Sequence, residues 1–236
     1  MTRSRPGSDQ LSLAFEEPTS GPRPVAVDRW SAPMAAADAD GPFDDPGWFY
    51  EPWWPGVSAT IVVAHDGMRL LGQLGDPLAA FPELSMVPGQ LRARSAVVPG
   101  TLLVLDADGR PDLAALQRRL VDPAERAGTG AFIAADLLEH DGELLAELPF
   151  ASRRARLLET VVDSDRFLAS RGLHGEGLTL AHAAASMGVE GVSARRLDAA
   201  WHPGPAPEAW LRFPVEGQPV PATRPLLVLL QRLPLD

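Results

Sequence analysis

The chain has 236 residues, enough for one sizeable domain that would bury roughly 70–75% of its unfolded surface. It contains no cysteine, which excludes disulfides and thiolate metal sites. No apolar run is long enough to span a bilayer, and no signal peptide is recognisable. We therefore expect a single core, a reducing cytoplasmic location and no membrane contact.

The basic residues are all of one type. The chain has 21 arginines and no lysine, and its formal net charge is −10. Such a charge repels phosphates, whereas nucleic-acid binders concentrate positive charge, so duplex DNA is a disfavoured partner. The densest basic cluster is Arg153, Arg154 and Arg156, which we expect on a solvated helix face.

The N-terminal half begins with residues 1–24, whose Ser, Pro, Gly and charged content predicts a disordered head. An aromatic segment follows at residues 48–56. Pro52 and Pro55 each remove a backbone donor there, so we expect a loop whose rings act as a packing plug, with regular pairing only from about Val57.

Strand and turn patterns continue along the chain. Val57–Ala64 and 68–73 predict a hairpin around a turn at 65–67, with His65 as a turn residue. Buried strands are expected at 97–105 and 131–138, each followed by a Gly-containing turn, and the run 113–120 predicts a short amphipathic helix.

Two further helices are predicted in the C-terminal half. Residues 151–162 form an arginine-rich helix whose apolar side would hold Leu157, Leu158, Val161 and Val162. Residues Gly177–Met187 form another, stopped by Gly188, with His182 on the surface and an expected inward side of Leu178, Ala181, Ala185 and Met187. One closing strand is expected at 226–230.

The segment Glu51 to Ala59 has the sequence Glu-Pro-Trp-Trp-Pro-Gly-Val-Ser-Ala. It resembles the first motif of ATP-dependent DNA ligases, in particular the bacterial end-joining type, which is Glu-(Pro/Val)-Lys-Trp-Asp-Gly-(Tyr/Phe)-Arg-Ala. Three positions depart from the family. Trp53 stands at the position of the nucleophilic lysine, Pro55 at that of an aspartate and Ser58 at that of an arginine.

The resemblance covers about residues 31–214, with six motifs in the family order. Leu148-Pro149-Phe150, Glu190-Gly191-Val192 and Trp210-Leu211-Arg212 belong to these motifs. Other chemical groups of the family are replaced, and the replacing residues are Gln73 for an arginine, Thr101 for a glutamate, Ala135 for a phenylalanine that packs near adenine, and Pro214 for a basic residue.

The resemblance implies an α+β fold of the ligase nucleotidyltransferase type, ATP-grasp-like, with two packed, largely antiparallel sheets, flanking helices and an ATP cleft between the sheets. It places the adenylation domain at 25–214, followed by an extension at 215–236 in place of an oligonucleotide-binding (OB) domain. It implies ATP and Mg²⁺ as cofactors, with Glu190 as a metal candidate. The nucleotide-binding candidates are Glu51, Trp54, Gly56, Asp136, Glu190, Arg195 and Arg212.

The function implied by the family is DNA end joining in repair and recombination, which begins when a lysine amine attacks the α-phosphate of ATP. Arginine cannot replace that lysine because its guanidinium stays protonated. The sequence therefore favours a non-catalytic, ligase-like protein that binds or regulates, with DNA-repair proteins as partners and residual nucleotide binding included. The alternatives are an active ligase with another nucleophile such as His65, and a different enzyme built on Asp136 and Glu190.

Overall fold

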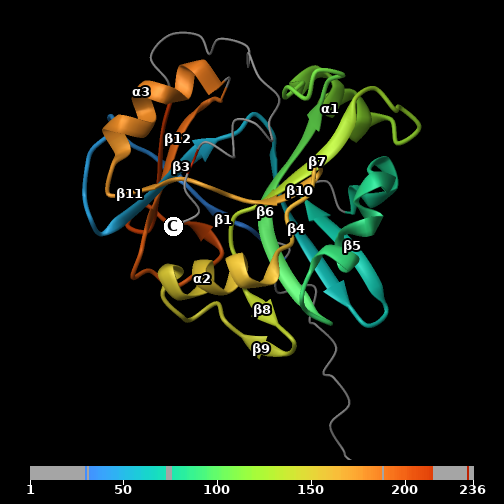
Figure 1. Ribbon diagram of the computed structural model, residues 1–236, viewed down its shortest axis with the longest axis horizontal. Helices are drawn as coiled ribbons and strands as arrows, with labels where there is room; N and C mark the ends of the chain where they lie inside the picture. Colours follow the sequence, from blue (N-terminus) through green and yellow to red (C-terminus); the bar gives the residue numbers. More distant parts are fainter. Residues whose placement is uncertain (1–29, 31, 73–75, 188, 215–232, 234–236) are drawn as a thin grey trace, which may run out of the picture.

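The computed structural model describes residues 30, 32–72, 76–187, 189–214 and 233, and its ribbon forms two main sheets with three α-helices around them (Figure 1). The expected head at 1–24, the closing strand at 226–230, Gln73 and Gly188 lie outside these residues. Within the described part, no helix is both long and apolar enough to cross a bilayer.

The larger sheet has the strand order β10-β7-β6-β4-β5, and the short hairpin β8-β9 extends it through β6. All its pairings are antiparallel except β10 with β7. Its strands are β4 (Val57–Ala64), β5 (Gly67–Gly72), β6 (Ala96–Leu105), β7 (Thr129–Ala134), β8 (Glu139–His140), β9 (Glu143–Leu144) and β10 (Phe167–Ala169).

The smaller sheet has the order β11-β3-β12-β14-β2, antiparallel except where β2 joins β14. A separate parallel pair joins β1 with β13. These strands are β1 (Met34–Ala35), β2 (Ala37–Asp38), β3 (Trp48–Trp53), β11 (Leu173–His174), β12 (Gly191–Arg196), β13 (Gly204–Pro205) and β14 (Trp210–Pro214). The predicted α+β fold with two largely antiparallel sheets is confirmed.

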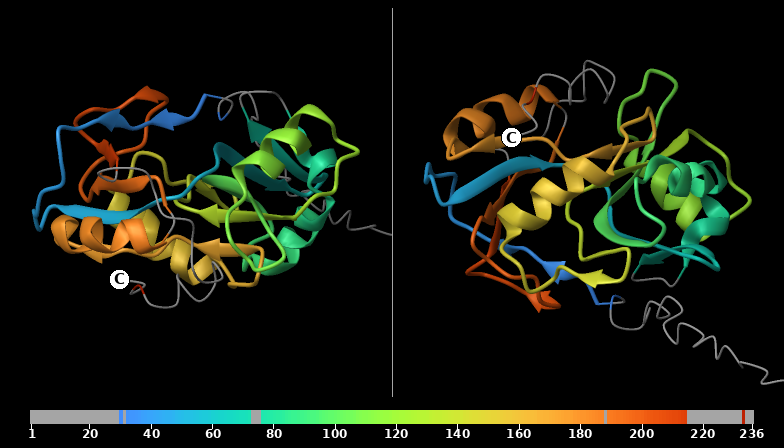
Figure 2. Two further views of the ribbon diagram at one scale, coloured as in Figure 1. Left: turned by 90° about the horizontal axis from the view of Figure 1, so that it is seen from above. Right: turned by 60° about the horizontal axis from the view of Figure 1, so that its bottom comes forward.

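One core cluster joins the two sheets. It contains Tyr50 and Val192 from the smaller sheet, Leu103 and Ile133 from the larger one, and Leu180 from α3 (Gly177–Met187). A second cluster fills the other face of the larger sheet, under α1 (Leu113–Val121) and the 3₁₀ segments η2 (Pro77–Ala80) and η3 (Pro82–Gln90). Helix α3 thus lies beside the smaller sheet, and α1 with η2 and η3 beside the larger (Figure 2).

Helix α2 (Phe150–Thr160) packs against both sheets. The ring centroids of Phe150 and of Phe49 on β3 are 6.3 Å apart, and Leu157 belongs to the core of the larger sheet. The predicted solvated arginine face on this helix is wrong for Arg153 and Arg154, which are 2% and 5% exposed. Both lie on the same helix side as Phe150 and Leu157, at spacings of three and four residues. Only Arg156 of the cluster is exposed, with 44% of its side chain accessible.

The predicted loop at the aromatic segment is wrong, since Trp48–Trp53 forms the strand β3, which pairs with β12 along its whole length. Pro52 is tolerated in β3 because the N–H that proline lacks would point away from the paired strand β12. The carbonyl of Trp53 accepts from Glu190 on the β12 side, whereas that of Trp48 accepts from Gly175 on the β11 side. Backbone groups alternate along a strand, so Pro52 faces the β11 side, beyond the two residues that pair with β11.

The predicted hairpin is confirmed as β4 and β5, with Ala64 paired to Gly67 and a two-residue turn at His65 and Asp66. The predicted strand 131–138 is too long. Its strand β7 ends at Ala134 because the next two backbone N–H groups, of Ala135 and Asp136, both turn to the carbonyl of Pro99, at 2.9 and 3.2 Å.

The predicted bounds of the last helix are confirmed in α3, but its predicted inward side is wrong in part. Leu180, Ala184 and Met187 are buried, whereas Leu178 is 48% exposed. This side follows a spacing of three and four residues, and it is the side that α3 turns toward β3 and β12. His182 is exposed, as expected.

Candidate functional site

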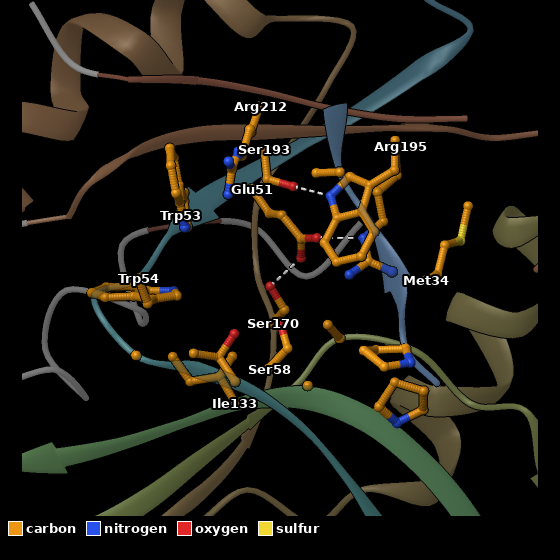
Figure 3. A pocket seen from close by; sticks show the side chains of 18 of the residues that line it. Met34, Glu51, Trp53, Trp54, Ser58, Ile133, Ser170, Ser193, Arg195 and Arg212 are labelled. Carbon is orange, nitrogen blue, oxygen red and sulfur yellow. Dashed lines mark hydrogen bonds and ion pairs between the residues drawn. The ribbon is translucent and has the colours of Figure 1, made fainter. Parts of the chain in front are cut away.

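A cavity of about 320 Å³ lies between the two sheets (Figure 3). The strands β3, β12 and β14 form one wall, and β4, β6 and the end of β7 form the other. The segment around β1 closes one side, because Pro33, Met34, Ala35 and Ala36 also line the cavity. The aromatic segment therefore borders an open cleft and does not fill it.

Glu51 on β3 is held by two partners inside this cavity. Its Oε1 accepts a 2.7 Å hydrogen bond from Nε of Arg195 on β12, and its Oε2 accepts one from the Ser170 hydroxyl. All three side chains are buried, and Figure 3 shows the carboxylate between its two donors. The negative charge of Glu51 is thus neutralised by a residue 144 positions away in the sequence.

Behind Arg195 the charges continue into the core. Nη1 of Arg195 lies 3.5 Å from Oδ2 of Asp136, which is fully buried. Arg153 binds the same carboxylate through two parallel hydrogen bonds of 2.9 Å, a geometry that makes arginine–carboxylate pairs strong. The ion pairs form one network with two charges of each sign, made by Glu51, Arg195, Asp136 and Arg153. This network stabilises the junction between β12 and α2.

Arg212 on β14 lies at the edge of the cavity, beside Trp53. Its Nε donates a 2.6 Å hydrogen bond to Asp38 of β2, and its guanidinium carbon lies 4.6 Å from the centroid of a Trp53 ring. The hydrogen bond and charge of Arg212 lower the pKa of Asp38, so this carboxylate is ionised at neutral pH. Arg212 is therefore paired both with a carboxylate and with an aromatic face.

Four tryptophans line the cavity, and the set comprises Trp53, Trp54, Trp201 and Trp210. The Trp210 indole donates to the Ser193 hydroxyl at 2.5 Å and lies under the Arg195 guanidinium, 4.2 Å from its ring centroid. Trp54 is different. Its indole N–H is buried and has no hydrogen-bond partner among the described residues.

Comparison with known sequences finds relatives among DNA ligases. The multifunctional non-homologous end joining DNA repair protein LigD of Mycobacterium tuberculosis is 30% identical over 166 residues, 70% of this chain and 21% of the relative. The LigD protein of Pseudomonas aeruginosa is 31% identical over 175 residues, 73% of this chain and 20% of the relative. The chain thus spans about a fifth of the length of these relatives. No model of a known protein family matches the sequence.

Solved structures point the same way. Mycobacterial DNA ligase D complexed with ATP and MES has a TM-score of 0.66 and 26% identity, over 78% of this chain and 60% of that one. The ligase domain of M. tuberculosis LigD has a TM-score of 0.64 and 27% identity, over 77% and 59%. This chain belongs to the ATP-dependent DNA ligase family.

Most of the family positions come together at the cavity. Of the nucleotide-binding candidates, those that line it are Glu51, Trp54, Gly56, Arg195 and Arg212, and the family's nucleophile position, Trp53, lines it too. A side chain at Gly56 would place its Cβ 2.5 Å from the carbonyl oxygen of Leu102, so glycine lets the ligase motif pack against β6.

The two acidic candidates lie elsewhere. Asp136 is buried behind the cavity wall, held by Arg153 and Arg195, and Glu190 is half-buried beside Trp53 outside the lining. Burial raises the pKa of Glu190, although the charge of Arg212 opposes the shift.

The donors present do not fit the metal ion that the ligase family implies. Across the described ranges, no group of three or more His, Asp or Glu side chains could hold a metal. The carboxylate inside the cavity, that of Glu51, is already occupied by a guanidinium and a hydroxyl. We therefore derive no step through Mg²⁺.

Sequence reasoning missed several site residues. These are Asp38, Arg153, Ser170, Ser193, Trp201 and Trp210, which hold or line the site. Trp210 lies inside a motif that resembles the ligase family, so the resemblance could have indicated it. Asp38 and Ser170 belong to no such motif, and only the pairing of distant strands brings them to the cavity.

Proposed function

We propose that this chain is a ligase-like protein of the end-joining DNA repair type that has lost lysine adenylation and acts by binding or regulation, with repair proteins as partners. One observation carries the proposal. Trp53 stands at the nucleophile position, lines the cavity, and no lysine is present anywhere in the sequence given. A tryptophan side chain offers no lone pair that could attack a phosphate, and arginine stays protonated.

The electrostatics of the cavity support the same proposal. Transfer of a nucleotidyl group needs preorganised positive charge at the phosphates. Both arginines that line the cavity are instead paired inside the protein, Arg195 with Glu51 and Asp136, and Arg212 with Asp38. The Ser58 and Thr101 side chains, where the family has arginine and glutamate, carry no charge.

No observation favours the two alternatives. His65 lies at the tip of the β4–β5 hairpin, exposed and outside the cavity lining, so it is poorly placed as a substitute nucleophile. Asp136 and Glu190, on which another enzyme could be built, do not meet in the cavity. The binding role therefore remains the proposal.

The decisive test is self-adenylylation. The full chain is incubated with ATP labelled at the α-phosphate and with Mg²⁺ or Mn²⁺, then separated by denaturing electrophoresis, beside an active lysine-containing DNA ligase as positive control. We expect label on the control and none on this chain, together with no sealing of nicked DNA. A stoichiometric covalent label on the chain would overturn the proposal.

A further inference from the structure

The cavity has the size and the walls of a small-molecule site. Its volume of about 320 Å³ lies at the lower end of the roughly 300–1,000 Å³ of ligand pockets. Four of its lining residues are tryptophans, and flat apolar rings favour stacking with an aromatic ligand. Ser58 on β4 and Thr101 on β6 are directly paired across the strands and place two hydroxyl-bearing side chains on the same wall.

Trp54 supplies a hydrogen-bond donor to this site. The residue is only 3% exposed, and its indole N–H has no partner among the described residues. Figure 3 shows its ring at the left side of the cavity with the nitrogen edge turned toward the interior. A buried donor without a partner is unfavourable, so a ligand that offers an acceptor to this N–H would gain affinity.

The charges around the cavity cancel one another. Three arginines, Arg153, Arg195 and Arg212, are matched by three carboxylates, Glu51, Asp136 and Asp38. The carboxylate of Glu190 also interacts with Arg212. A phosphorylated ligand would therefore meet no uncompensated positive charge on the described walls, and would add its own charges to a protein whose net charge is −10.

From these features we infer that the cavity binds an uncharged, flat heteroaromatic ligand of about nucleoside size, and that it discriminates against the phosphorylated forms of that ligand. The inference deepens the proposed function and rests on it, because a protein that transfers no nucleotidyl group has no need to hold a triphosphate. The rings supply stacking, the Trp54 N–H supplies one polar contact, and the internal ion pairs remove the attraction for phosphate.

Isothermal titration of the full chain with adenosine, AMP and ATP, all without metal, tests the inference. We expect adenosine to bind at least about tenfold more tightly than ATP, because like charges brought together at a site cost free energy. AMP should lie between the two. ATP binding more tightly than adenosine, or an absence of adenosine binding at millimolar concentration, would overturn the inference.

A separate variant tests the ion pair between Asp38 and Arg212 at the edge of the cavity. Asp38→Asn releases Arg212 from its carboxylate, and Asp38 is exposed enough for the change to leave folding intact. We expect the affinity for ATP to rise relative to adenosine by roughly two- to fivefold, the size of one exposed charge pair. The matched control is Asp66→Asn, which removes an exposed partner of Arg69 on the distant β4–β5 hairpin and should leave the ratio unchanged. Equal ratios in all three proteins would contradict the assignment.

The donor is tested by Trp54→Phe, which keeps an aromatic ring and removes the N–H. Adenosine affinity should fall by about fivefold or more, whereas Trp48→Phe, the same change at the start of β3 and outside the cavity lining, should not alter it. Unchanged binding in Trp54→Phe would contradict the proposed contact. Covalent labelling by ATP would contradict the proposed function, whereas tighter ATP binding without a label would contradict only the ligand inference.

Discussion

At the scale of single residues, Trp53 removes the lysine nucleophile of the family and adds a ring that packs against Arg212. The family's nucleophile position carries an indole that is half-buried and packs against the Arg212 guanidinium at 4.6 Å. An arginine over an indole contributes about 0.5–1 kcal/mol at a partly exposed site. The ring therefore packs against one of the two arginines that line the cavity.

The variant Trp53→Lys should not create a ligase. Lysine restores the nucleophile, but the positions of Pro55, Ser58 and Thr101 stay unlike the family, and losing one preorganised group already costs about 10²–10³ in rate. The melting temperature should also fall, because the introduced ammonium group would face Arg212 without the ring. ATP labelling and thermal unfolding check both expectations, with Trp53→Phe as the control that keeps a ring. Efficient labelling at an unchanged melting temperature would contradict our interpretation.

Arg153 is a residue on which folding depends. It neutralises the fully buried Asp136 through two hydrogen bonds and also donates to the carbonyl of Ala199 at 3.0 Å. Arg153→Met should lower the free energy of unfolding by about 3–5 kcal/mol, because it leaves a buried carboxylate short of its partner. Denaturant unfolding measures this. The control Arg156→Met removes an exposed arginine of the same helix and should cost less than about 1 kcal/mol.

At the scale of elements, Glu83 links η3 to α1 and β7 through hydrogen bonds. Its carboxylate accepts hydrogen bonds from Arg119 of α1, at 2.8 and 2.9 Å, and from the backbone N–H of Gly130 in β7. The Arg119 guanidinium lies over the Phe81 ring at 4.5 Å and donates to the carbonyl of Ala80. These contacts join η2, η3, α1 and β7 on the outer face of the larger sheet.

The hydrogen bonds to Glu83 make the free energy of unfolding depend on pH. Burial alone would raise the pKa of Glu83, but the hydrogen bonds from Arg119 and Gly130 outweigh it and lower the pKa below its usual value of 4.5. The stabilisation is therefore complete above pH 4.5 and is lost as the pH falls through the lower folded pKa. Glu83→Gln should reduce stability at pH 7 and flatten the decline below pH 4.5. Unfolding curves against pH test this, with the exposed Glu147→Gln expected to follow the parent.

At the scale of the whole molecule, the net charge of −10 governs encounters with nucleic acid. The buried Arg153 and Arg154 are not available to a phosphate, and exposed arginines such as Arg94, Arg156 and Arg196 are paired with carboxylates. We expect no duplex DNA binding tighter than about 1 µM at physiological salt. Mobility-shift titration at low and high salt measures it. Salt-sensitive binding below about 1 µM would show that a basic surface outweighs the net charge.

The sequence by itself determined the elements whose causes are local. The β4–β5 hairpin follows from two β-rich runs around a short turn, α1 follows from its amphipathic pattern, and the bounds of α3 follow from an apolar run that ends before a glycine. The order of ligase-like motifs also indicated that Glu51, Gly56, Arg195 and Arg212 would meet, and they line one cavity.

Only the tertiary structure decided which charges are available and where strands pair. Pro52 fits within β3 because the neighbouring strand β11 pairs only with Phe49 and Tyr50. Arg153 can be buried because it donates hydrogen bonds to Asp136, which follows the end of β7. Asp38 reaches Arg212 from 174 positions away. The energy of a charge or of a missing N–H depends on partners that are distant in the chain, so local sequence patterns cannot carry that information.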